Sequence, residues 1–178
     1  MKNLLLLLAL TLTLLSCDKG TFKGKDQLPA ETQTGANTVG CLVNGQVFLP
    51  HAEGINPEVN CFYQLVDGEY FFNMAFSDLR GTGVKTVSVR TSKINLETNG
   101  NYILDQENTI FEEFVGGGGV YGINAANYFY TSTLKTGELK IIKLDPVNAI
   151  ISGTFWFDAV NSAGETVEIR QGRFDWNY

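Results

Sequence analysis

Short glycine-containing turns between strand-like segments constrain this chain most strongly. Asn-Gly and Asp-Gly are the dipeptides that favour two-residue hairpin turns, because both of their residues tolerate a positive φ. The sequence therefore predicts two β-hairpins: Thr38–Val43 with Gln46–Leu49 around Asn44-Gly45, and Cys61–Val66 with Glu69–Ser77 around Asp67-Gly68.

The residues after position 16 favour sheet over helix. They include 44 Val, Ile, Phe, Tyr and Trp against 20 Leu, Ala and Met, a bias typical of β-strands. Only Asn108–Val115 is a helical candidate, and it is short. Further strands are expected at Thr86–Thr91, Tyr128–Thr133, Glu138–Leu144, Ala149–Val160 and Glu165–Trp176. We expect an all-β domain of about ten antiparallel strands, a β-sandwich or a flattened β-barrel.

The last predicted strand carries a change of phase. Val167 and Ile169 occupy odd positions, whereas Phe174 and Trp176 occupy even ones. Because side chains alternate between the two faces of a strand, one extra residue is needed to keep both apolar pairs on one face. The sequence predicts a β-bulge near Gln171-Gly172.

The first sixteen residues are typical of a bacterial signal peptide. Lys2 precedes Leu4–Leu15, an almost unbroken apolar run of twelve residues, which is too short to span a bilayer. The run ends in Leu14-Leu15-Ser16-Cys17, which resembles the lipobox of bacterial lipoproteins. That resemblance implies cleavage before Cys17 and lipidation of its sulfur. An ordinary signal peptide that happens to end near a cysteine is the alternative.

Residues 17–36 have the composition of a linker, and 37–178 are expected to form one domain. The segment after Cys17 is polar, with glycine and proline and few apolar residues. The 142 residues that follow suffice for a single hydrophobic core. Cleavage after Ser16 would change the formal net charge from −6 to −7 by removing Lys2.

The other two cysteines, Cys41 and Cys61, form an even pair in the first two hairpins. An exported protein meets oxidising conditions, so a Cys41–Cys61 disulfide is expected. Two separately buried thiols are the alternative. Zinc is not favoured, because two cysteines and one histidine lack the close spacing of zinc ligands.

Two motifs suggest activities that their surroundings do not support. Gly117–Gly122 formally matches the GxGxxG fingerprint, but no helix follows it, so Gly116–Gly119 is predicted to be a flexible loop. A catalytic role for His51 would need a nucleophile, and the chain contains no GxSxG-type nucleophile elbow. His51 is therefore predicted to lie at the surface. Acidic residues that suggest a carboxylate pair or a calcium site lack the required spacing: Glu112, Glu113, Asp145 and Asp158. No enzymatic activity and no cofactor are expected.

Aromatic residues occur on both faces of two predicted strands. Tyr128 and Tyr130 alternate with Phe129, and Trp156 points away from its two phenylalanine neighbours. Outward aromatic rings can stack on sugars or form an interface. The preferred interpretation is that both faces of these strands are covered in a two-layered fold.

The chain resembles a group of small lipoproteins from Bacteroidetes-type bacteria. The resemblance depends on three stretches: Thr34–Gly45 (TGANTVGCLVNG), Ile150–Phe157 (IISGTFWF) and Gln171–Asp175 (QGRFD). These motifs are structural, and the family they indicate has no known function. The resemblance therefore implies a location and a fold but no activity.

Taken together, the sequence predicts a cell-envelope protein anchored through Cys17, most consistent with the outer membrane on its periplasmic or external face. It is expected to be a non-enzymatic binding or interaction module, with a glycan or a protein as a possible partner. A carrier of small hydrophobic ligands in a barrel cavity is one alternative, a glycan-binding surface lipoprotein is another, and a carboxylate-dependent hydrolase is a third. The net charge of −6 disfavours nucleic acid as a partner, because phosphate binding needs a basic surface.

Overall fold

The computed structural model describes residues 27–54, 58–81, 83–107, 109, 114–124 and 126–178. This part of the chain is all β and holds no helix that could span a membrane. The predicted signal peptide, Cys17, and the first part of the tether lie outside it. Most of the helical candidate at Asn108–Val115 does so too.

Eleven strands form one mixed sheet, in the order β2-β1-β11-β10-β9-β6-β7-β5-β4-β3, with β8 paired to β7 and β10. They are β1 (Thr38–Val43), β2 (Gln46–Phe48), β3 (Val59–Val66), β4 (Glu69–Asp78), β5 (Lys85–Ser92), β6 (Asn101–Leu104), β7 (Gly116–Ile123), β8 (Asn127–Tyr130), β9 (Gly137–Asp145), β10 (Ile150–Val160) and β11 (Thr166–Asn177).

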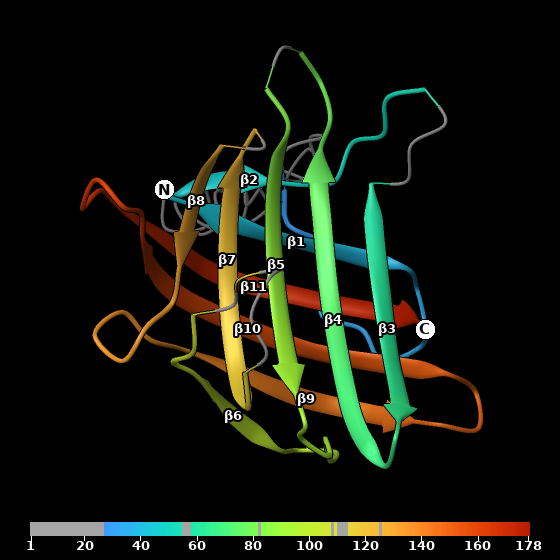
Figure 1. The fold of residues 1–178 in the computed structure, drawn as a ribbon. Helices are drawn as coiled ribbons and strands as arrows, with labels where there is room; N and C mark the ends of the chain where they lie inside the picture. The colour runs from blue at the N-terminus through green and yellow to red at the C-terminus, as the bar shows by residue number, and fades with distance from the viewer. Residues whose placement is uncertain (1–26, 55–57, 82, 108, 110–113, 125) are drawn as a thin grey trace, which may run out of the picture.

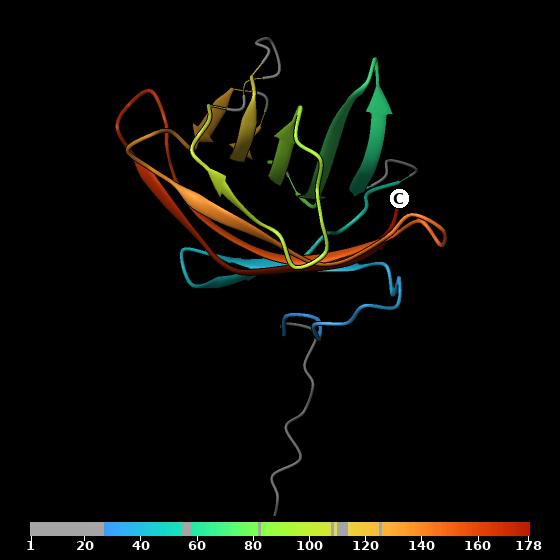
Figure 2. The ribbon, with the colours of Figure 1, turned by 90° about the horizontal axis from the view of Figure 1, so that it is seen from below.

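The sheet bends over on itself into two layers (Figures 1 and 2). One layer contains strands β8, β7, β5, β4 and β3, and the other contains β2, β1, β11, β10 and β9. The strands of the two layers cross at a large angle (Figure 1). The predicted two-layered all-β fold is confirmed. The pairing is not wholly antiparallel, because β6 and β7 are parallel where Leu104 meets Gly117.

Both predicted hairpin turns are present. Asn44 and Gly45 have φ values of 48° and 78°, and Asp67 and Gly68 have values of 51° and 85°. Positive φ at both central residues is the geometry whose twist matches that of the flanking strands. Asn44 and Asp67 suit these positions because asparagine and aspartate tolerate a positive φ better than most residues do.

The predicted bulge in β11 is confirmed. Phe155 lies opposite Gly172 and Phe157 opposite Ile169, so β11 has one residue more than β10 between these pairs. Gln171 takes up the extra length with a φ of 51°. As a result Ile169 and Phe174, which differ in phase, are both buried.

The core between the layers is filled largely by aromatic rings. Phe155 packs near Phe76, Phe157 and Phe174, with ring centroids 6.4–6.5 Å apart. Among the described residues, eight aromatic side chains are buried: Phe48, Phe72, Phe76, Tyr121, Phe129, Phe155, Phe157 and Phe174. Rings from both layers thus occupy the space in which a ligand carrier would have its cavity.

The prediction that Gly116–Gly119 forms a flexible loop is wrong. Gly116–Gly119 is not a flexible loop but the first half of β7, paired with β5 along its length. A Cβ at Gly119 would lie 2.7 Å from Cδ1 of Phe157, and one at Gly117 would lie 2.5 Å from the carbonyl oxygen of Ile103. Gly119 therefore allows the close approach of Phe157 from the opposite layer, and Gly117 that of the neighbouring strand β6.

The expected Cys41–Cys61 disulfide is not formed in the structure, where both cysteines are free. Cys41 is on β1 opposite Phe48 and lies near Tyr121. Cys61 is on β3 opposite Met74 and lies near Tyr178, at the C-terminal end of β11. The two hairpins are neighbours in sequence, but the sheet places them at its two ends.

Residues 27–36, which the sequence assigns to the tether, lie on the outer face of the layer that contains β1 and β11 (Figure 2). We call this segment the strap. Asp175 of β11 binds it through the backbone N–H groups of Thr34, Gly35 and Ala36, at 2.8–3.1 Å, and through the hydroxyl of Thr32 at 2.7 Å. The strap is thus hydrogen-bonded to the domain.

Candidate functional site

Two tyrosine rings, one exposed and one half-buried, form a ledge on the outer face of β8. Tyr128 and Tyr130 project from the same face of the strand, and their rings stack with centroids 6.0 Å apart and planes inclined by 26°. The side chain of Tyr128 is 36% exposed. Phe129 between them points into the core, where its ring packs against Tyr121. The alternation of the strand therefore anchors the ledge from behind.

The ledge forms one wall of a surface hollow of about 330 Å³. The hollow also contains polar groups from three other segments: Glu107, Thr131 and Ser132, and Asn161 and Ser162 at the end of β10. Flat apolar rings beside hydroxyl and carboxylate groups are an arrangement that suits a ligand with both apolar and polar faces.

Asn161 holds the far wall of this hollow in place. Its Oδ1 accepts hydrogen bonds from the backbone N–H groups of Ala163 and Glu165, at 3.1 and 2.9 Å. Its Nδ2 donates to Oδ1 of Asn127 at 3.1 Å and to Oε2 of Glu165 at 2.7 Å. Because Asn127 begins β8, these bonds connect the β10–β11 turn to the strand that carries the ledge.

Thr131 fixes the floor of the hollow. Its buried hydroxyl donates to the carbonyl oxygen of Gln106 at 2.6 Å and accepts from the backbone N–H of Gly119 at 2.9 Å. The segment that carries Glu107 is thereby attached to β7. Burial raises the pKa of Tyr130, as do the nearby Tyr128 and Glu107. The Tyr130 hydroxyl is therefore protonated at neutral pH and able to donate a hydrogen bond.

A second hollow of about 400 Å³ lies on the other side of Tyr128, which lines both. Glu53, Val84, Thr86 and Asn124 contribute to its walls. Gly122 lies opposite Tyr128 on β7, and a Cβ there would be 3.0 Å from Cε1 of the tyrosine ring. The absence of a side chain at Gly122 lets the Tyr128 ring lie against β7, between the two hollows.

Comparison with protein families identifies the chain. A family model described as a domain of unknown function, DUF6252, matches residues 79–175, which is more than half of the chain. The chain belongs to the DUF6252 family. No curated protein and no solved structure matches it. The expected membership of a family without a known function is thus confirmed.

The DUF6252 match contains the tyrosine ledge and all the residues named for the first hollow. It begins directly after β4 and ends at Asp175, so the strap and the strands β1 to β4 precede it. The match therefore covers the part of the fold in which the site lies.

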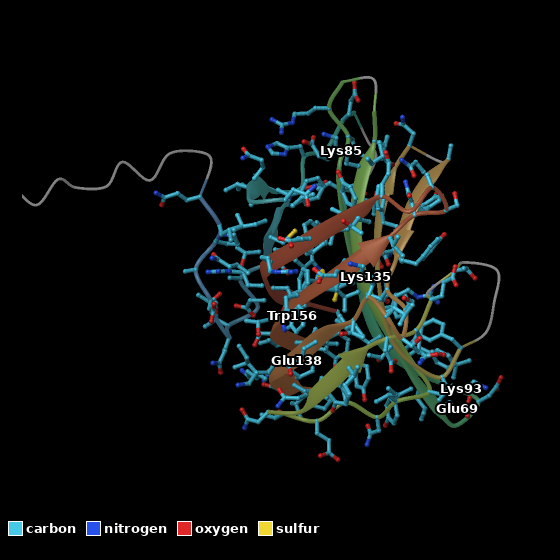
Figure 3. All side chains as sticks on the ribbon, turned by 90° about the vertical axis from the view of Figure 1, so that its left-hand side faces the viewer. Glu69, Lys85, Lys93, Lys135, Glu138 and Trp156 are labelled. Atoms are coloured by element: carbon cyan, nitrogen blue, oxygen red, sulfur yellow. The ribbon has the colours of Figure 1, made fainter. Side chains whose placement is uncertain are left out.

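Trp156 is the other exposed ring of this DUF6252 chain that the sequence singled out, and it is 41% exposed. It lies on β10 opposite Glu138 of β9, in the layer away from the ledge (Figure 3). The guanidinium of Arg170 covers the ring at 5.5 Å from its centroid and binds Asp158 at 2.6 Å. Arg170 thus already stacks on this ring, whereas no cationic side chain among the described residues stacks on the ledge.

The structure explains the remaining singled-out residues by local contacts. His51 is half-buried. Its Nδ1 lies 3.0 Å from the carbonyl oxygen of Leu49 and 3.9 Å from Oδ1 of Asp78. Asp145 accepts hydrogen bonds from Asn148 within its own turn. Glu112 and Glu113 lie outside the described residues. Within the described residues, no group of three or more His, Cys, Asp and Glu gathers to hold a metal ion.

Sequence reasoning found the ledge only in part. The alternation of Tyr128, Phe129 and Tyr130 indicated aromatics on both faces, but the preferred interpretation covered both faces, and Tyr128 is exposed. Glu107 and Asn161 were not predicted to belong to the site. The signal available for Asn161 was its place at the end of a predicted strand, before the turn Ser162-Ala163-Gly164.

Proposed function

We propose that this chain is a lipid-anchored cell-envelope protein whose domain binds a glycan at the tyrosine ledge. The role is one of binding rather than catalysis. The single observation that carries the glycan assignment is the stacked, outward-facing pair Tyr128 and Tyr130 at the wall of a polar hollow.

Sugar rings present an apolar face of C–H groups and an equatorial rim of hydroxyl groups. The ring faces of Tyr128 and Tyr130 suit the first, and the hydroxyls and carboxylate of the hollow suit the second. Asn161 and Thr131 fix the surrounding segments through internal hydrogen bonds. A wall that is already in place loses little conformational entropy on binding.

The expected ligand is a neutral glycan. Glu107 lines the first hollow and Glu53 the second, and the whole chain has a formal net charge of −6. A carboxylated or sulfated sugar would meet like charge at both ends of the ledge. Neutral hexoses and N-acetylated hexosamines have no such penalty.

The test is binding to an array of neutral and acidic glycans, followed by affinity measurements on any ligand that is retained. Tyr128→Ala is expected to weaken binding about three- to tenfold, since an aromatic contact contributes about 0.5–1.5 kcal/mol beyond its area. Trp156→Ala, an exposed ring already covered by Arg170, is the matched control and should leave affinity unchanged. Equal losses in the two variants, or no glycan retained, would contradict the proposal.

The aromatic core gives less support to the carrier of hydrophobic ligands. A carrier needs an apolar cavity between the layers, but Phe157 lies against Gly119 of the facing layer, and further rings occupy the space around it. The two hollows on either side of Tyr128 are open at the surface.

The anchor is proposed from the lipobox-like Leu15-Ser16-Cys17 and from the resemblance to lipoproteins of Bacteroidetes-type bacteria. The strap, which continues the tether, lies on the outer face of the β1–β11 layer, whereas β8, which carries the ledge, belongs to the opposite layer (Figure 2). Nine residues separate Cys17 from the strap, and a random coil of that length has an end-to-end distance of about 17 Å. With this attachment, the ledge would face away from an outer membrane.

Metabolic labelling with an alkyne analogue of palmitate tests the anchor independently of the ligand. The wild-type chain should be labelled and sediment with membranes, and Cys17→Ala should lose both properties. Cys41→Ala, which removes a different cysteine, is the control. Labelling of Cys17→Ala at the wild-type level would contradict lipidation at this residue.

A further inference from the structure

Strand β3 ends the sheet, and no described strand pairs with its outer edge. The order of strands begins with β2, which has three residues, and ends with β3, which has eight. Natural edge strands usually avoid pairing with other chains by being short or by carrying charge, proline or a bulge. β3 (VNCFYQLV) is long, uncharged, free of proline and paired to β4 in continuous register.

The register shows which backbone groups point outward. Val66 and Glu69 flank the two-residue turn and form a hydrogen-bonded pair, and the N–H of Ser77 donates to Glu58 in the same register. Hydrogen-bonded pairs alternate with non-hydrogen-bonded pairs in an antiparallel ladder. The N–H and C=O groups of four residues therefore point away from β4: Val59, Cys61, Tyr63 and Leu65. None of these groups bonds to another described residue.

We infer that β3 pairs in antiparallel fashion with β3 of a second copy of this chain, about a two-fold axis at Phe62. This register lets all four outward-pointing residues bond across the interface. Val59 then lies opposite the second copy's Leu65, and Cys61 opposite its Tyr63. A shift by one residue would bring outward groups against inward ones and break the ladder.

The side chains of β3 complement their own copies in this register. Phe62 meets Phe62 at the two-fold axis, and Asn60 meets Gln64, so aromatic lies against aromatic and amide against amide. Leu65, which is 56% exposed, would be covered by Val59. No charged residue occurs in β3, so no like charges oppose each other when the strand meets itself. These features favour a second copy over a charged partner.

Disulfide trapping tests this register in the full-length chain, in the cells that express it. Phe62→Cys places two thiols opposite each other in a non-hydrogen-bonded pair, with Cα atoms about 4.5 Å apart. Mild oxidation should give a disulfide-linked dimer on a non-reducing gel. Gln64→Cys is the matched control, because its two copies would be offset by about 14 Å along the strands. We expect at least tenfold more dimer from Phe62→Cys.

Two further variants keep the test decisive. Leu65→Pro removes one outward N–H without removing a bond to β4 and should abolish trapping in the Phe62→Cys background, whereas Leu65→Thr should not. If Phe62→Cys fails to fold, co-expression of Asn60→Cys with Gln64→Cys should give a mixed dimer, because these positions are opposite each other. Equal trapping of Phe62→Cys and Gln64→Cys, or no trapping in folded protein, would overturn the inference.

Discussion

The Oδ1 atom of Asp175 lies 2.8 Å from the backbone nitrogen of Gly35, which precedes it by 140 residues. Asp175 is 1% exposed, and its other oxygen accepts bonds from Thr32, Thr34 and Ala36. A buried carboxylate needs such donors to replace its lost hydration. The last strand thus holds the strap, which would otherwise continue the tether.

Asp175→Ala should release the strap and destabilise the domain. Bonds to a charged acceptor contribute about 1.5–3 kcal/mol each but are not additive, so we expect a loss of about 3 kcal/mol in the free energy of unfolding. Urea unfolding measures the loss, and hydrogen exchange of residues 32–36 measures release. Asp175→Asn keeps one acceptor oxygen and should lose less. Unchanged exchange of the strap in Asp175→Ala would show that other contacts hold it.

The strap contact should also depend on pH. Burial by itself raises the pKa of Asp175, but the bonds from the strap outweigh it and leave the pKa lower than usual. A lowered folded-state pKa gives stability that is complete above about pH 4, the usual value for aspartate, and lost as the pH falls through the folded-state value. The stability difference between wild type and Asp175→Asn should therefore shrink below pH 4. A constant difference from pH 6 to pH 3 would contradict this.

Substitution of Gly119 by alanine should destabilise the domain, because the ring of Phe157 lies against this glycine. A Cβ would lie 2.7 Å from the Phe157 ring, so we expect Gly119→Ala to cost about 1–3 kcal/mol of unfolding free energy. In the Phe157→Leu background the same change should cost less, and a double-mutant cycle measures this coupling. Gly122→Ala is the control, because it meets only the ring of the exposed Tyr128. Equal costs at the two glycines would contradict this account.

Gln171 should be replaceable by glycine but not by a β-branched residue. Its φ of 51° costs about 1–2 kcal/mol for an L-residue, whereas glycine adopts it freely and loses about 0.5–1 kcal/mol through unfolded-state entropy. Gln171→Gly should therefore match or slightly exceed wild type in urea unfolding. Gln171→Val should fall below wild type by about 1 kcal/mol, because a β-branched residue tolerates a positive φ less well than glutamine does. A valine variant as stable as wild type would show that the bulge lies elsewhere.

Cys41 and Cys61 should behave as separate, unreactive thiols. Burial raises the pKa of both, that of Cys61 to about 12, so little thiolate forms at neutral pH. Maleimide should label neither in the folded protein and both after unfolding without reductant, as read by mass spectrometry. Recovery of a linked peptide with Cys41 and Cys61 would contradict the free thiols of the structure.

Much of the fold could be predicted because its signals are local. Asn44-Gly45 and Asp67-Gly68 specify their turns through φ, and the phase change in β11 specifies its bulge through the alternation of side chains. The prediction of a loop at Gly116–Gly119 was wrong because the signal for a strand there is not local. Gly116–Gly119 has no alternation to read, and the requirement for glycine comes from Phe157 and Ile103, which are remote in sequence.

The candidate site was less predictable, because its parts come from separate segments. Glu107, Tyr128 and Asn161 meet only when β8 pairs with both β7 and β10. The disulfide was expected from compartment and cysteine count, but neither says where two strands of a sheet lie.

The sequence by itself determined the all-β class, two hairpins and the bulge, since each depends on a few neighbouring residues and on the two-residue period of a strand. Only the tertiary structure decided the exposure of Tyr128, the docking of the strap on Asp175 and the separation of Cys41 from Cys61. These depend on which strands the bent sheet places side by side, and that is set by the packing of the whole core.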